Sequence, residues 1–117
     1  MQFMLIIQEP RGQRAARTPA EGEQAYATMQ RWAGTLAERG LLRAGESLAR
    51  DDQAVRVQVR EGQPRLTDGP FAEAKEMVGG FFVVDCTGRE QALALAAECP
   101  AAAWATVEVR ALAPCYA

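Results

Sequence analysis

Two helix-start signals, each placed after an apolar run, constrain the fold of this chain more than any other feature. Thr18-Pro19-Ala20-Glu21 is a capping box with Pro at the first helical position, where side chains satisfy two free amide donors. Thr87-Gly88-Arg89-Glu90 repeats the Thr-x-x-Glu pattern. Apolar runs of strand length precede both signals, at residues 2–8 and 81–86. The sequence therefore predicts two units in which a β-strand is followed by a helix.

The first predicted helix ends at Gly40 and the second at Pro100, which cannot continue a helix. Apolar residues at spacings of three and four give the first helix one stripe, which consists of Tyr26, Met29, Ala33, Leu36 and Ala37. The second helix has small and apolar residues that can pack on a sheet, namely Ala92, Leu93, Ala96 and Ala97.

Between the two units, residues 41–48 resemble a short strand interrupted at Gly45, and residues 55–60 alternate apolar with polar, as a strand with one face on the core does. A turn at 61–63 leads into 64–67, and 105–112 forms a last alternating strand. The order β-α-β-meander-β-α-β predicts the α+β class and the ferredoxin-like, or split βαβ, plan. In that plan an antiparallel sheet carries both helices on one face.

The opposite face of such a sheet needs cover, which a second subunit can provide. Four apolar residues share a parity that predicts a position on this face, namely Phe3, Leu5, Phe81 and Val83. We therefore predict a homodimer.

The amino-acid composition limits the classes of function that are open to this chain. A chain of 117 residues predicts one domain over 1–117, and a net charge of −2 gives no basic footprint for nucleic acid. No apolar run approaches about 18 residues, so we expect no membrane span and a cytoplasmic protein.

The chain has no His, which excludes Ser-His-Asp and Cys-His nucleophiles and the commonest zinc sites. The three cysteines match no metal or redox spacing and are interpreted as small buried apolar residues, and we predict neither a metal nor a cofactor.

Residues 9–17 carry Pro10, Gly12 and three arginines, at 11, 14 and 17. This composition favours a solvated loop, and anion binding is the alternative.

The most concentrated group of special residues spans 66–80. Asp68-Gly69-Pro70 is a strong turn signal, and residues 72–77 predict one or two helical turns. Gly79-Gly80 ends these turns, at a place where a backbone or ligand can approach closely.

In the functional interpretation Asp68 and Glu73 are catalytic carboxylates, one of them with a pKa raised by burial. The predicted ligand contacts are Gly69, Pro70, Phe71, Lys75 and Glu76, together with Trp32 and Glu46. In the structural interpretation Asp68 caps the following turn, Phe71 fills the core and the charged residues are solvated; Trp32 likewise fits plain core packing.

Residues 67–76, with Gly79-Gly80-Phe81 after them, resemble the defining segment of the DGPF-motif proteins of the YCII-related family. Further similar segments are 1–8, Gly45-Glu46-Ser47-Leu48, Cys99-Pro100 and 107–110. The resemblance implies a dimeric α/β barrel of ferredoxin-like subunits, of bacterial origin, often encoded beside alternative sigma factors. Ala74 stands where the family usually has Thr or Ser, and a His-Asp pair proposed as catalytic in one branch does not transfer to a chain without His.

The family has no assigned activity, so three function classes stay open. The first is a carboxylate-based enzyme acting on a small molecule in a cleft around Asp68-Gly69-Pro70-Phe71 of the homodimer. The second is a non-catalytic small-molecule sensor that works with a transcription regulator such as a sigma factor. The third is a structural or interaction dimer. Clustered site-like residues count against the third, and the missing His counts against the first.

Overall fold

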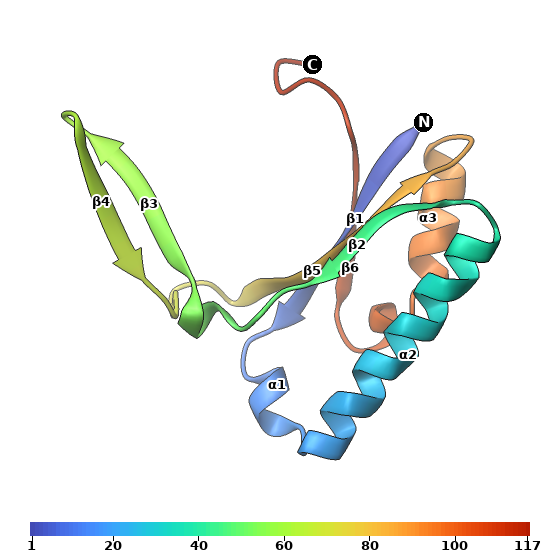
Figure 1. Cartoon of the computed structure of the whole chain (residues 1–117), viewed down its shortest axis with the longest axis horizontal. Coiled ribbons are helices and arrows are strands. Elements are labelled where there is room, and N and C mark those ends of the chain that lie inside the picture. The colour runs from blue at the N-terminus through green and yellow to red at the C-terminus, as the bar shows by residue number, and fades with distance from the viewer.

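The computed structural model describes residues 1–117 and shows a four-stranded antiparallel sheet, helices packed on one of its faces, and a separate hairpin (Figure 1). The sheet has the order β2-β5-β1-β6, with β1 (Gln2–Pro10), β2 (Leu42–Ser47), β5 (Glu76–Asp85) and β6 (Thr106–Ala111). Helix α2 (Pro19–Glu38) connects β1 to β2, and α3 (Arg89–Glu98) connects β5 to β6. This arrangement confirms an α+β fold with an antiparallel sheet and is compatible with the ferredoxin-like plan.

Helix α2 begins as predicted. The Thr18 hydroxyl accepts a hydrogen bond from the Glu21 amide at 3.1 Å, and the Glu21 carboxylate accepts one from the Thr18 amide at 2.8 Å. Gly40, with φ of +71°, ends the helical segment in the left-handed conformation that favours glycine.

The predicted stripe of α2 faces the core at three of its five residues, since Leu36 is buried and Met29 and Ala33 are half-buried. Trp32 and Leu36 are buried, whereas Tyr26 and Ala37 are exposed. The Trp32 ring meets Phe82 of β5 edge to face, with 5.2 Å between centroids. The buried side of α2 therefore includes Trp32 beside the stripe.

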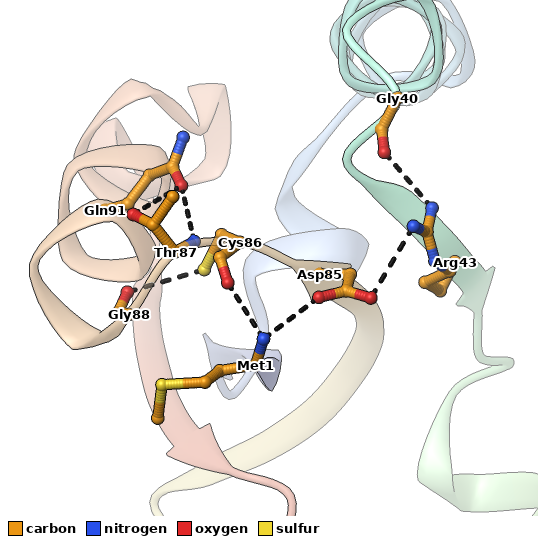
Figure 2. A network of polar contacts seen from close by, with 8 residues as sticks. All are labelled: Met1, Gly40, Arg43, Asp85, Cys86, Thr87, Gly88 and Gln91. Atoms are coloured by element: carbon orange, nitrogen blue, oxygen red, sulfur yellow. Dashed lines mark hydrogen bonds and ion pairs between the residues drawn. The ribbon is translucent and has the colours of Figure 1, made fainter.

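Helix α3 begins at the predicted place but not by the predicted capping box. Its N-cap is Gly88, which has no side chain to accept a hydrogen bond. Instead the Thr87 amide and hydroxyl contact Oε1 of Gln91 at 2.8 and 3.1 Å (Figure 2). The helix packs closely on the sheet because its buried positions are mostly small, namely Ala92, Leu95 and Ala96.

The prediction for the open sheet face was wrong at two of its four residues. Phe3 and Leu5 are buried under the helices. The antiparallel register pairs Leu5 with Phe82 and Ile6 with Phe81, so even residues of β1 share a face with odd residues of β5. We use the name open-face patch for the apolar residues on the side away from the helices, which are Met4, Ile6, Phe81 and Val83.

Residues 9–17 do not form a solvated loop. Strand β1 continues to Pro10, and a short helix, α1 (Gln13–Ala16), follows Gly12, whose φ of +82° reverses the chain. Strand pairing with β5 extends β1, because Glu9 and Pro10 find partners at Met77 and Glu76.

Strands β3 (Val55–Arg60) and β4 (Gln63–Asp68) form a hairpin outside the main sheet, which we call the arm. The prediction that β3 has one face on the core was wrong, because all six of its residues are exposed. The predicted helical turns at 72–77 are also absent. That segment is irregular up to Glu76, where β5 begins, and Gly79-Gly80 lies inside the strand.

One end of the sheet is tied by a polar network (Figure 2). The amino group of Met1 donates to the Asp85 carboxylate at 3.1 Å and to the Cys86 carbonyl at 2.9 Å. Arg43 of β2 lies 3.5 Å from the same carboxylate and donates to the Gly40 carbonyl at 3.1 Å. Of the three cysteines, Cys86 and Cys99 are buried as predicted, whereas Cys115 is exposed.

Candidate functional site

A cleft of about 640 Å³ lies between α2 and the sheet. Its size falls within the range of about 300–1,000 Å³ that small-molecule sites occupy. Residues from β1, α1, α2, β2 and β5 line it, and the segment after α3 contributes Ala101 and Trp104. Its apolar and aromatic wall consists of Ile7, Tyr26, Met29, Leu42, Phe82 and Trp104.

A buried ion pair lies at the floor of this cleft. Glu9 is only 9% exposed, and its two carboxylate oxygens accept from Nε and Nη2 of Arg14 at 2.9 and 2.8 Å. Arg14 also donates to the carbonyls of Leu48 and Gly79, at 2.8 and 3.2 Å. This fork geometry satisfies both partners, as burial of a charged pair requires. The pair thereby joins α1 to β1, to β5 and to the segment after β2.

Glycines make room for the floor. A Cβ on Gly79 would lie 1.8 Å from the Glu9 carboxylate, so the acidic side chain occupies the space that any other residue would need. A Cβ on Gly80 would lie 2.8 Å from the Glu46 carbonyl of the neighbouring strand. The expectation of a close approach at Gly79-Gly80 is thus confirmed, although the approaching groups are Glu9 and the β2 backbone.

Three charged residues of the cleft have no ion-pair partner in the structure. Arg17 lies over the Trp104 ring at 5.7 Å, while Arg50 and Glu46 are exposed. Two free guanidinium groups beside one carboxylate give the mouth of the cleft a net positive charge, which suits an anionic ligand group.

The predicted site residues do not gather in one place. Glu46 lines the cleft, and Trp32 is buried with its indole N–H lacking a hydrogen-bond partner. The other predicted residues are not on the cleft wall. Of these, Phe71 is buried, Gly69 is half-buried, and Asp68, Pro70, Glu73, Lys75 and Glu76 are exposed.

Gly69 and Phe71 take part in anchoring the arm. A Cβ on Gly69 would lie 1.8 Å from the Asp51 carbonyl oxygen, and the Gly69 amide donates to the Ala54 carbonyl at 2.8 Å. The Gly69–Pro70 peptide is cis. The Arg56 guanidinium of β3 stacks on the Phe71 ring at 3.5 Å. Only glycine fits at 69 in this packing, which gives the turn a structural reason for its sequence.

Two acidic residues near this anchor have lowered pKa values. The hydrogen-bonded Arg11 guanidinium holds the pKa of Asp51 below its ordinary value, and the Phe71 amide contributes in the same direction. Hydrogen bonds from its own backbone amide and from Arg56, at 3.2 Å, lower the pKa of Glu73. Both carboxylates are therefore stabilised in their ionised form. A lowered pKa at Glu73 is the opposite of the raised pKa that a general acid at neutral pH needs.

Sequence reasoning did not select Glu9 or Arg50, and it named Arg14 and Arg17 only within the segment 9–17, where anion binding was the alternative interpretation. One signal was present, because Glu9 continues the inward parity of Phe3, Leu5 and Ile7 on β1. A carboxylate at an inward position requires a buried partner, and the arginine-rich segment 11–17 follows directly. Arg50 and Trp104 reach the cleft only through tertiary contacts that leave no local pattern.

No group of three His, Cys, Asp or Glu side chains comes together in a geometry that could hold a metal ion. None of the helices combines the length and the apolar character needed to cross a bilayer.

The fold places this chain among small α+β domains with a cleft of ligand size beside the sheet. Its family follows from comparison with known sequences, since the profile of the YCII-related domain matches residues 1–115, and the chain belongs to the YCII-related family. An uncharacterized protein of Rhizobium meliloti (strain 1021), R00369, is 47% identical over 32 residues. That match covers 27% of this chain and 26% of the relative.

Proposed function

We propose that this protein binds a small organic anion in the cleft between α2 and the sheet, and that it does so as a homodimer. The observation that carries the proposal is the cleft itself, which joins an apolar wall to two unpaired guanidinium groups, those of Arg17 and Arg50. A ligand with a carboxylate or phosphate group and an apolar body matches this lining. The open-face patch supports the dimer, because an apolar sheet face of this kind is commonly covered by a second subunit.

The lining supports binding more than catalysis. Of the two carboxylates that line the cleft, Glu9 is held in a bidentate ion pair, and proton transfer would break that pair. Glu46 is the other one, and it is exposed. An enzyme using this cleft would therefore have Glu46 or the phenol of Tyr26 as its acid or base.

A thermal-shift screen of organic acids and phosphate esters tests the proposal. A ligand at a hundredfold its dissociation constant stabilises the protein by about 2.7 kcal/mol, which is a readily measured shift. Arg50→Gln should weaken a ligand found in this way about tenfold or more, because hydrogen bonds between charged groups contribute about 1.5–3 kcal/mol. Arg65→Gln is the matched control, since Arg65 is exposed on the arm and does not line the cleft.

Two results would contradict the proposal: no anion in the screen shifts the melting temperature, or Arg50→Gln binds as tightly as the wild type. Turnover of the ligand that is abolished by Glu46→Gln, with affinity unchanged, would instead identify an enzyme. The proposed catalytic role of Asp68 and Glu73 stays a separate prediction. Asp68→Asn and Glu73→Gln test it by the same comparison of turnover with affinity.

A further inference from the structure

The arm is a two-stranded ribbon with one apolar and one polar side. Val57 faces Leu66 across the two strands, and Gln58 faces Arg65. The apolar side carries Val55, Val57, Val59 and Leu66, which are 51–67% exposed. The register adds Pro64 to this side and, opposite Val55 at the base of the arm, Asp68. The other side of the arm carries Arg56, Gln58, Arg60 and Arg65. Alternation of this kind is the pattern of a strand with one buried face, yet nothing in the protomer covers this face.

The base of the arm is fixed. Arg56 stacks on the buried Phe71 ring, and backbone contacts join Gly69 to the segment that precedes β3. Figure 1 shows the arm leaving the sheet on the side opposite α2 and α3, so it projects on the same side as the open-face patch. The side chain of Arg56 points to Phe71, and the apolar side of the arm is therefore turned away from its own anchor.

A two-stranded arm with an uncovered apolar side is only marginally stable on a single protomer in water. An isolated two-stranded hairpin is marginally stable, and both edges of this one are unpaired. The protomer exposes 7766 Å², whereas a compact monomer of 12.7 kDa exposes about 6,200 Å². Its radius of gyration of 16.0 Å likewise exceeds the value of about 13 Å expected for its length. The excess surface, about 1,500 Å², is larger than the roughly 800 Å² that each partner buries in a standard interface.

We propose that the apolar side of the arm packs against a second copy of this chain, beside that copy's open-face patch. The exposed area supports a second copy as the occupant, because the excess surface is larger than the area that one partner buries in a standard interface. The three arginines of the arm lie on its polar side, so covering the apolar side leaves their charges in solvent. This contact rests on the proposed homodimer and adds to it an interface separate from the sheet face.

Sedimentation equilibrium of two single variants tests the contact. Val57→Lys adds one positive charge on the apolar side of β3. Gln58→Lys adds the same charge at the next residue, which lies on the polar side of the strand. Both positions are exposed in the protomer, so both variants should keep its fold. We expect Val57→Lys to weaken dimerisation about a hundredfold or more, because an isologous dimer contains the substitution twice, and Gln58→Lys to change it little.

Three outcomes decide the proposal. A dimer weakened by Val57→Lys and not by Gln58→Lys supports it. A dimer unaffected by Val57→Lys refutes the arm contact and leaves the homodimer in place. A wild-type protein that sediments as a single chain at micromolar concentration refutes both, without affecting the test of ligand binding in the cleft.

Hydrogen exchange of the wild type keeps the test decisive if Val57→Lys does not fold. Amides at the apolar centre of the arm, those of Val57 and Leu66, should exchange slowly in the dimer and fast on dilution to the monomer. Equal exchange rates in the two states would refute the contact.

Discussion

Replacement of Arg14 by Met should reveal how much stability the floor of the cleft provides. Met keeps most of the apolar stem and removes the charge and every donor. The substitution deletes two hydrogen bonds to the Glu9 carboxylate and one each to the carbonyls of Leu48 and Gly79. Glu9 cannot simply turn to solvent, because its side chain is packed against Gly79 inside the cleft.

The magnitude follows from the burial of the pair. Removing one partner of a fully buried ion pair costs about 3–5 kcal/mol, because a charge stays behind without compensation. The Glu9 and Arg14 side chains are 11% and 23% exposed, so water reduces the penalty. We expect Arg14→Met to lower the free energy of unfolding by about 2–3 kcal/mol. For a domain of this length the loss corresponds to a melting temperature lower by about 10 °C.

Urea unfolding at a fixed protein concentration measures this loss, since the proposed dimerisation would make stability depend on concentration. Arg39→Met is the matched control, because Arg39 and Glu98 form an ion pair whose side chains are 46% and 50% exposed. We expect less than about 1 kcal/mol there. Glu9→Gln/Arg14→Met should be more stable than the sum of the single effects predicts, by about 1 kcal/mol or more. Additive single effects, or a loss below about 0.5 kcal/mol for Arg14→Met, would refute the reasoning.

Three further predictions concern the anchor, its pH dependence and the thiols. Gly69→Ala should destabilise the fold by about 2 kcal/mol or more through the clash with the Asp51 carbonyl, whereas Gly34→Ala, inside α2 with open space around it, should stabilise it by about 0.5–1 kcal/mol; urea unfolding of the two variants should give opposite signs. Arg11 lowers the pKa of Asp51 below its ordinary 3.8, so the pair stabilises the fold above that pH and this stability is lost as the pH falls through the lower folded-state pKa. Arg11→Gln should therefore be less stable than the wild type at neutral pH, by a margin that narrows in acid, because the Asp51 contribution titrates whereas the hydrogen bond to the Ala74 carbonyl is lost at every pH. A margin that does not change with pH contradicts this account. Cys115 should react with a thiol reagent in the native protein, while Cys86 and Cys99 react only after unfolding, since both are buried and burial raises the pKa of Cys99; rapid labelling of all three would show that the core opens.

Local signals account for the parts of the fold that were predicted correctly. The capping box at Thr18 and the left-handed Gly40 define both ends of α2 through contacts within a few residues. The apolar run at 2–8 predicted a strand, and the structure has β1 there, between β5 and β6. Each of these features depends on neighbours in the sequence, which is why pattern and spacing were sufficient.

The predictions that were wrong concern segments whose structure depends on residues distant in the sequence. Alternation at 55–60 correctly predicted a strand, but the predicted contact of one face with the core was wrong, because all six residues of β3 are exposed. Residues 72–77 were predicted to form helical turns, whereas pairing with β1 makes the chain from Glu76 onward a strand. The register between β1 and β5 determines which of their residues lie on the same face and so belong to the open-face patch. This register includes a bulge between Ile7 and Gln8.

From sequence alone, the order of elements, the α+β class and the resemblance to the YCII-related family were determined, because capping, periodicity and turn chemistry are local. The tertiary structure determined which contacts each of these segments makes. It made the segment at Gly69 and Phe71 the anchor of a projecting arm, and it brought Glu9, Arg14, Arg17 and Arg50 to one cleft. Both results depend on packing between segments far apart in the chain, such as Gly69 against Asp51 and Glu9 against Gly79, and no spacing along the sequence encodes those contacts.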